Sequence, residues 1–346
     1  MPCFDTGSDC AQHMNMDDGL REKEDLLIQP GGACSGAIMG AGQPAFSLRM
    51  PAGRPIPVLI AVPHAGRSYP ASLMDSMRDP DYSCLRLEDR HVDQIASKVA
   101  QQTGAALLVA HAPRAMIDLN RAGDDVDWEM IKEGKRDGAP QPLANRRSRH
   151  GLGLIPRRLP HLGEIWKGQF TRDQLDTRIE RVHRPYHQAL SQALELLRDQ
   201  WGAALLLDLH SMPPLKPKNP GDQPAELVIG DRFGASSDAL LVASAFAYLA
   251  GCKRPAAHNR PYAGGYILDR HAAPARGIHA IQLELCRSTY LDSDLAEPSS
   301  QMAAIVRLIT GLVRELGECT SDLGSDLGRN SGRDAGRDGD LQIAAE

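Results

Sequence analysis

The sequence predicts one α/β domain with three layers, in which helices cover both faces of a largely parallel mixed sheet. Short apolar runs alternate with stretches of helical period, which is the pattern of such sheets. The run at 203–212, AALLLDLHSM, is almost continuously apolar, as expected of a strand that is covered on both faces. The other predicted strands are 58–62, 105–113 and 278–286.

Periodicity predicts three helices, at 89–104, 175–201 and 299–317. The first and last carry their apolar residues on one face, and Gly104 ends the first. Pro185 lies inside the second helix and should kink or break it, because proline has no N–H to donate.

The ends of the chain differ from its middle in composition. Residues 1–44 predict an irregular leader. Residues 319–346, which are mostly small, glycine or charged, predict a disordered tail. The folded domain is therefore expected at 45–318. Within it, 122–170 is long, charged and rich in glycine and proline, which favours a lid over a binding site.

Composition excludes several classes of function. The net charge of −5 gives no basic balance that would indicate nucleic acid. No apolar run is long enough to span a bilayer, and the first thirty residues lack the apolar core of a signal peptide. Seven cysteines without a C-x-x-C pair fit a reducing compartment. We expect a cytoplasmic protein that binds neither nucleic acid nor membrane; the sequence leaves its oligomeric state open.

Polar residues gather at the ends of the predicted elements, where open α/β sheets bind ligands. They are His64 after the strand 58–62, Glu88, Asp89, His91 and Asp93 at a helix start, Asp208 and His210 on the strand 203–212, and Glu284 on the strand 278–286. Singly, each has an ordinary explanation. A lone histidine is more often a core or surface residue than a ligand, and a pair of acids can cap a helix.

Together these residues indicate a metal-dependent hydrolase. Two histidines and a carboxylate can hold a catalytic zinc ion and leave a fourth position for water, while a glutamate that is not a ligand serves as general base. Glu284 suits that role, because a carboxylate on an apolar strand is costly to bury without a partner. Asp208 alternates onto the same strand face as His210 and can orient its imidazole. Iron, manganese or cobalt would suit the same ligands.

The segment RAMIDLNR contains Arg114, Asp118, Asn120 and Arg121. A guanidinium donates two parallel hydrogen bonds to a carboxylate, so this segment predicts recognition of an acidic substrate. A salt bridge at the surface is the alternative interpretation.

These motifs, in order, resemble the N-formylglutamate amidohydrolase family. The matching stretches run from about 57 to 292: VPHAGRSYP, EDRHVD, RAMIDLNR, GLGLIPRR with GEIWKG, VHRPYHQAL, DLHSMP, GGYILDRH and HAIQLELCRSTYLD. The resemblance implies a zinc carboxypeptidase-like fold, similar also to the aspartoacylase-type deacylases. It implies a Zn²⁺ cofactor and hydrolysis of the N-formyl amide of formylglutamate to glutamate and formate, the last step of one route of histidine degradation.

The resemblance leaves the third metal ligand open. The wider relatives take two ligands from H-x-x-E, but Arg67 stands three residues after His64, so the carboxylate must come from elsewhere. We choose Asp89, which predicts a metal site of His64, Asp89 and His210. The rivals of Asp89 are Glu88, His91 and Asp93. If His91 is not a ligand, we expect it to contact one of the ligands on the side that faces away from the metal.

The substrate is expected to be a small acidic N-acyl amino acid. Asn120 and Arg121 match, in type and order, the Asn–Arg pair that binds the terminal carboxylate in the wider family, and Arg114 is a second candidate. One alternative is a related zinc deacylase that acts on another N-acyl amino acid. Another is a protein that binds an acidic amino acid without turnover, although Glu284 beside two histidines argues against it.

Overall fold

A mixed sheet of seven strands forms the centre of the protein. The computed structural model describes residues 36–51, 55–134, 146–217 and 221–334. The strands lie in the order β1-β3-β2-β6-β9-β7-β8, and neighbours run parallel except β1 with β3 and β7 with β9. Their bounds are β1 Phe46–Arg49, β2 Val58–Val62, β3 Ala106–Ala110, β6 Ala204–Met212, β7 Leu227–Gly230, β8 Ala256–His258 and β9 Ile278–Cys286. The predicted α/β class with a largely parallel sheet is confirmed.

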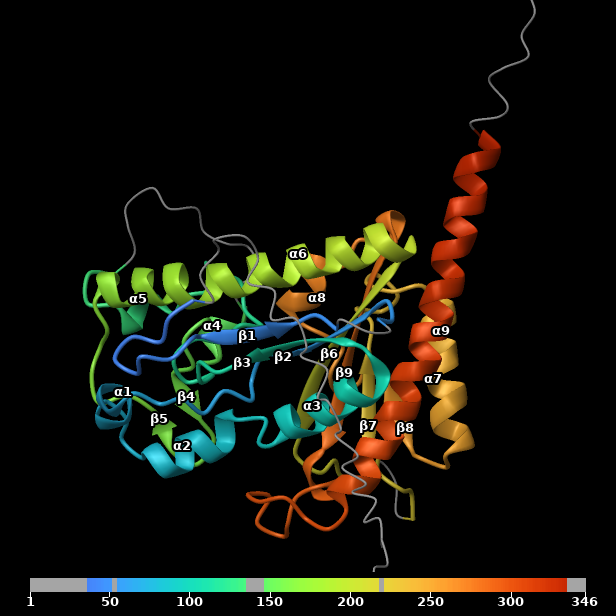
Figure 1. Cartoon of the computed structure of the whole chain (residues 1–346). Helices are drawn as coiled ribbons and strands as arrows, with labels where there is room; N and C mark the ends of the chain where they lie inside the picture. The colour runs from blue at the N-terminus through green and yellow to red at the C-terminus, as the bar shows by residue number, and fades with distance from the viewer. Residues whose placement is uncertain (1–35, 52–54, 135–145, 218–220, 335–346) are drawn as a thin grey trace, which may run out of the picture.

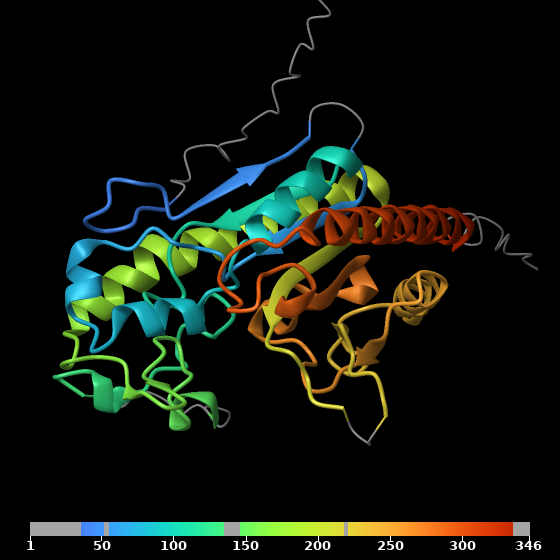
Figure 2. The same ribbon diagram turned by 90° about the horizontal axis from the view of Figure 1, so that it is seen from below.

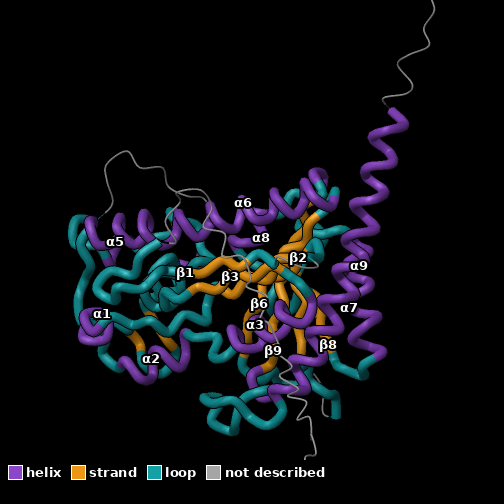
Figure 3. The backbone as a smooth tube through the Cα atoms, viewed as in Figure 1, coloured by secondary structure: helices purple, strands orange, loops and turns teal. Residues whose placement is uncertain are grey.

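Helices cover both faces of the sheet, as Figures 1 and 3 show. On β2, Leu59 and Ala61 pack into the core with α6 (Arg184–Trp201), while Val58, Ile60 and Val62 face the other way. That second core includes α3 (Val92–Thr103), α7 (Ala239–Gly251) and α9 (Met302–Asp334). Successive side chains of a strand point to opposite faces, so strands that are covered on both faces, such as β2 and β3, are apolar throughout.

Short elements surround the two helical layers. They are α1 Ala71–Asp75, α2 Pro80–Leu87, α4 Arg146–Arg149, α5 Arg172–Arg178, α8 Tyr266–His271 and the two-stranded ribbon of β4 Arg158–Leu159 and β5 Gly163–Glu164. The predicted strands correspond to β2, β3, β6 and β9. The short strands β1, β7 and β8, and the helix α7, were not predicted.

Pro185 interrupts the long helix as expected, but through a π turn. The structure has α5, a π-helical turn at Ile179–His183, and then α6, with the proline in its first turn. Pro185 has no N–H to donate to the carbonyl of Arg181, four residues earlier, so that carbonyl lacks its α-helical partner. The N–H of Ala37 donates to that carbonyl at 3.1 Å, so the segment before β1 fills the gap.

The prediction of a disordered tail from residue 319 is wrong as far as residue 334. Helix α9 continues to Asp334 and lies between α3 and α7 (Figure 2). The glycines of this stretch suggested disorder, but at least one of them is needed for packing. A Cβ built on Gly324 would lie 2.1 Å from the Trp201 carbonyl, so this glycine lets α9 approach the end of α6. Residues 335–346 lie outside the described chain. Although α9 is long, no helix of the described ranges is apolar enough to cross a membrane.

Two further domain predictions stay untested. Most of the leader lies outside the described residues, and 36–44 forms turns before β1. The described parts of 122–170 pack on the body of the domain, with Ile165 and Trp166 buried, while Arg147 and Leu152 line the main cavity. Closure of this stretch over a ligand remains a prediction, and its residues 135–145 lie outside the described chain.

Candidate metal centre

The carboxyl ends of three neighbouring strands meet at one cavity of about 1750 Å³. His64 follows β2, His210 lies near the end of β6, and Glu284 occupies the position of β9 that pairs with His210 in the sheet register. All three side chains are buried. Parallel strands present their ends at the same edge of a sheet, which is why residues so distant in sequence share one cavity.

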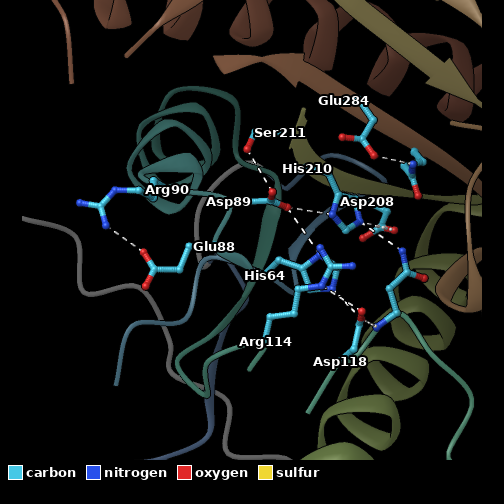
Figure 4. A network of polar contacts seen from close by, with 12 residues as sticks. His64, Glu88, Asp89, Arg90, Arg114, Asp118, Asp208, His210, Ser211 and Glu284 are labelled. Carbon is cyan, nitrogen blue, oxygen red and sulfur yellow. Dashed lines mark hydrogen bonds and ion pairs between the residues drawn. The ribbon is translucent and has the colours of Figure 1, made fainter. Parts of the chain in front are cut away.

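Asp89 stands between the two histidines. Its Oδ2 lies 3.0 Å from Nδ1 of His210 and 3.6 Å from Nδ1 of His64. One ligand atom from each of the three residues lies within 4.8 Å of the others (Figure 4). The main-chain N–H of Asp89 donates to the carbonyl of His64 at 2.9 Å, which ties the start of the α3 segment to the end of β2. The structure therefore brings together the predicted trio.

Each imidazole is held from behind by a carboxylate. Nε2 of His64 lies 2.7 Å from Oδ1 of Asp118, and Nε2 of His210 lies 3.0 Å from Oδ2 of Asp208. With both Nε2 atoms donating outward, both Nδ1 atoms face Asp89, and that of His64 is buried without a hydrogen-bond partner among the described residues. Carboxylates behind inward-facing imidazoles are typical of metal sites, so the residues fit a divalent ion. The sequence analysis assigned this role to Asp208 but missed Asp118.

The second oxygen of Asp89 is also occupied. Oδ1 accepts hydrogen bonds from Oγ of Ser211 at 3.0 Å and from Nη2 of Arg287 at 3.3 Å. Arg287 donates from Nε to Ser211 as well, so the three groups form one buried network. This network leaves only Oδ2 of Asp89 for the centre of the site. Sequence reasoning named neither Ser211 nor Arg287, because a serine and an arginine after a strand are common.

The charges of the trio favour a cation. Burial raises the pKa of Asp89, but the hydrogen bond with His210 and the nearby imidazole of His64 outweigh it and hold the pKa well below the usual range. Burial lowers the pKa of His210, yet Asp208 and Asp89 hold it well above the usual value. Buried carboxylates of this density need a compensating positive charge, which either a proton on His210 or a divalent ion can supply.

The rivals of Asp89 point elsewhere. Glu88 pairs with Arg90 at 3.0 Å, and Asp93 forms a two-pronged ion pair with Arg67. His91 begins α3 with a left-handed backbone (φ 61°). Its Nδ1 lies 3.0 Å from Nε2 of Gln94 and its Nε2 lies 3.4 Å from Glu297, so the structure does not bring it to the trio.

Glu284 lines the cavity beside the trio. Burial raises the pKa of Glu284 to about 7, and the negative charges of Asp89 and Asp208 also act to raise it. Nε2 of Gln282 donates to its Oε1 at 2.9 Å. Tyr262, which the sequence analysis missed, lines the same cavity, and the charge of Glu284 contributes to its raised pKa after burial. A carboxyl that titrates near neutral pH in such a cavity is suited to proton transfer.

The Asn120–Arg121 pair lines the cavity next to the metal trio. The guanidinium of Arg121 donates to the main-chain carbonyls of Leu152 and Asn120, and within the described chain it makes no ion pair with a carboxylate. Burial lowers the pKa of Arg121. Arg114 also lines the cavity, with its Nε on Asp118 at 2.9 Å. A half-buried cation without a carboxylate partner is a natural site for an anionic ligand.

Asn120 is fixed by the start of α8. Its Oδ1 accepts the N–H of Ile267 at 2.9 Å, and a Cβ on Gly265 would lie 2.6 Å from the same oxygen. Nδ2 of Asn120 lies 3.4 Å from Nε2 of His210. When Nε2 of His210 carries the proton that faces Asp208, it cannot also accept from Asn120. The amide donor is then available to a ligand.

A parallel-sheet edge with a buried His–Asp–His group that could hold a metal ion and a separate carboxylic acid is the arrangement found in metal-dependent hydrolases. Comparison with known proteins agrees. The family model described as N-formylglutamate amidohydrolase matches residues 56–291, and the chain belongs to this family.

Relatives resemble the chain over most of their own length. N-formylglutamate deformylase of Pseudomonas aeruginosa is 29% identical over 268 residues, covering 76% of this chain and 92% of the relative. The protein of that name from Pseudomonas putida is 31% identical over 261 residues, covering 70% and 88%. The crystal structure of N-formylglutamate amidohydrolase from Ralstonia eutropha superimposes with a TM-score of 0.71 at 32% identity, covering 80% of this chain and 98% of that one.

Removal of either histidine should empty the metal site. In His64→Ala and His210→Ala proteins, loss of one of three ligands disrupts both affinity and geometry. Elemental analysis of the purified proteins should find the metal near one per chain in the parent and near zero in both variants. His91→Asn is the matched control, because asparagine tolerates the left-handed backbone there. Full metal content in His64→Ala or His210→Ala would refute the assignment.

Asp118→Asn should weaken metal binding without abolishing it. The amide can still accept from His64, but it removes the charge that makes the imidazole a better ligand, a change that typically costs about 10–100-fold in metal affinity. Competition with a fluorescent chelator measures the effect. Asp231→Asn, which alters a buried aspartate paired with His258 outside the trio, should leave the affinity unchanged. Equal affinities in all three proteins would show that Asp118 has no role at the centre.

Proposed function

We propose that the protein catalyses zinc-dependent hydrolysis of the N-formyl amide of N-formyl-L-glutamate, giving glutamate and formate in histidine degradation. The observation that carries the proposal is Glu284, a buried acid that lines the same cavity as the His64–Asp89–His210 trio. The relatives named N-formylglutamate deformylase support the choice of substrate.

The metal ligands are proposed to be Nδ1 of His64, Oδ2 of Asp89 and Nδ1 of His210. A zinc ion held there would polarise the formyl carbonyl and acidify water. The outer carboxylates, Asp118 and Asp208, keep the two imidazoles in the tautomer that presents Nδ1 inward. The protein thus contributes a preformed, buried ligand set, and other divalent ions of similar preference would fit it.

Glu284 is proposed to move the protons of the reaction. Its carboxylate accepts a proton from the attacking water as the C–O bond forms, and the resulting carboxylic acid donates that proton to the amide nitrogen as the C–N bond breaks. The hydrogen bond from Gln282 fixes the carboxylate, and burial keeps its two protonation states close in free energy near neutral pH.

Asn120 and Arg121, with Arg114 as the second candidate, are proposed to hold a carboxylate of the glutamate part. Asn120 and Arg121 both line the cavity that contains the trio, and each keeps side-chain N–H donors beyond those used on main-chain carbonyls. A planar guanidinium fork matches a carboxylate in geometry and charge, which directs the amide of the substrate toward the ligand set.

A related deacylase that acts on a bulkier N-acyl amino acid is the second candidate. The cavity volume of about 1750 Å³ exceeds the roughly 300–1,000 Å³ that is usual for small-molecule sites, so it leaves room for a larger acyl group. Steady-state assays with N-formyl-, N-acetyl- and longer N-acylglutamates compare the two. Formate release that is abolished by a chelator and restored by zinc supports the deformylase; faster release of a longer acid from the bulkier substrates would favour the deacylase.

Glu284→Gln should retain the metal and lose about 10²–10⁴-fold in kcat, the usual contribution of a general base. The substitution keeps the shape of the side chain and removes its ability to accept a proton. Elemental analysis and steady-state kinetics measure the two properties. Loss of the metal in this variant would make Glu284 a ligand.

The pH profile gives a second measurement on the same residue. Only the carboxylate form of Glu284 accepts a proton, so kcat/KM should fall as the pH drops below about 7, where its pKa lies. A bound divalent cation favours the carboxylate and moves this acidic limb to lower pH. The limb should disappear in Glu284→Gln; an unchanged limb would assign it to another group.

Arg121→Lys should weaken kcat/KM for N-formylglutamate by about ten- to a hundredfold, because lysine cannot reproduce the two parallel hydrogen bonds. The effect should be much smaller for an analogue in which the matching carboxylate is an amide. Asn120→Ala should behave similarly with a smaller loss, since Asn120 is neutral. A loss of the same size on both substrates would mean that Arg121 only braces the fold.

A further inference from the structure

A cluster of three buried histidines lies behind the Asn120–Arg121 pair and has no part in the proposed chemistry. His183 ends the π turn, His187 follows on α6, and His271 ends α8. The rings of His183 and His187 are 4.4 Å apart, and those of His187 and His271 stack at 5.2 Å. None of the three lines the cavity, whereas Tyr266, which packs against His183 and His187, does.

These histidines do not form a second metal site among the described residues, where the only such group of ligands is the His64 trio. Nδ1 of His187 faces Nε2 of His271 at 2.9 Å, so the two rings bond to each other. Burial lowers the pKa of all three histidines. The cluster is therefore a neutral, packed support, and its function must be sought in what it contacts.

The contact that reaches the site is made by His183. Its Nε2 lies 2.8 Å from the main-chain carbonyl of Arg121. A carbonyl can only accept, so Nε2 carries the proton and the tautomer is fixed. The helical stretch from α5 to α6, which contains His183, contacts the segment 116–121 at a second point. Nη1 of the buried Arg178 donates to the carbonyl of Met116 at 2.9 Å.

A π turn separates the two contacts along the chain. The turn joins α5 to α6 between Arg178 and Pro185. Because a π turn is wider than an α-helical turn, it rotates the side chains that follow it relative to those that precede it. Arg178 precedes the turn and His183 ends it. Their side chains form hydrogen bonds with the main-chain carbonyls at the two ends of the segment 116–121.

We propose that His183 is a positioning residue for carboxylate recognition, acting through the main chain of Arg121. The proposal rests on the assignment of Asn120 and Arg121 in the proposed function. Arg121 uses its Nε and Nη1 on main-chain carbonyls, so the direction of its remaining donors depends on where its own backbone is held. Loss of the His183 bond frees that backbone and should reduce affinity for the carboxylate while leaving the metal ligands in place.

The test compares two amide side chains of different length. Glutamine places its N–H where Nε2 of histidine lies, whereas the shorter asparagine cannot reach the Arg121 carbonyl. His183→Asn and His183→Gln are each loaded with zinc and checked for metal content and helical circular dichroism. His279→Phe is the matched control, because His279 is a buried histidine that bonds a main-chain N–H, that of Asp238, away from the cavity.

Calorimetry then measures binding of glutamate, glutamine and isoglutamine, which differ only in which carboxylate is replaced by an amide. We expect His183→Asn to bind glutamate about tenfold more weakly, the size of effect of one lost hydrogen bond, and to show no loss with one of the two amides. The glutamine variant should stay within about threefold of the parent, and His279→Phe should match it. In kinetics with N-formylglutamate, KM should rise about tenfold in His183→Asn and kcat should hold.

A loss of the same size on all three ligands, or no loss on any, overturns the positioning role. A parent protein that binds glutamate no better than either amide overturns it as well. If the parent binds glutamate through a carboxylate but releases no formate, the proposed hydrolysis fails, while the binding series still decides the role of His183.

Discussion

The site depends on one buried carboxylate, that of Asp89, held between two imidazoles. A carboxylate taken out of water costs several kcal/mol unless partners replace its hydration. Here Oδ1 is satisfied by Ser211 and Arg287, and Oδ2 faces Nδ1 of both His64 and His210. Because these partners come from three separate segments, those of His64, His210–Ser211 and Arg287, the carboxyl ends of the strands must come together before Asp89 can be buried. A cation in the middle of the group relieves the same constraint.

The sheet supplies the rigidity that this arrangement needs. His210 and Glu284 occupy paired positions on β6 and β9, the two longest described strands, so the distance between the proposed metal ligand and the proposed proton acceptor is set by main-chain hydrogen bonds. The loops supply what the strands cannot. Asp118, which orients His64, lies four residues after Arg114 and two before Asn120. One short segment therefore contacts the trio through Asp118 and lines the cavity through Asn120, which would couple the orientation of His64 to the proposed substrate recognition.

The segment that contains Asp118, Asn120 and Arg121 is held from two sides by residues that have no part in the proposed reaction. The start of α8 fixes the amide of Asn120, with Gly265 allowing the close approach, and the π turn before Pro185 brings His183 to the carbonyl of Arg121. These contacts account for two motifs, GGYILDRH and VHRPYHQAL, whose residues have no evident catalytic chemistry. Their role is visible only as packing.

The sequence by itself determined the class of the sheet, its four longest predicted strands, and the positions of His64, His210 and Glu284, because apolar runs that end in polar residues are local signals. It left open which of four neighbouring acidic or histidine side chains joins the histidines. It also misjudged the tail, where composition concealed the close packing of Gly324. Only the tertiary structure decided that Asp89 turns inward, that Asp118 contacts His64 and that His183 contacts the carbonyl of Arg121. Each of these choices depends on side-chain direction between segments that lie 54 to 122 residues apart, and no local pattern records such directions.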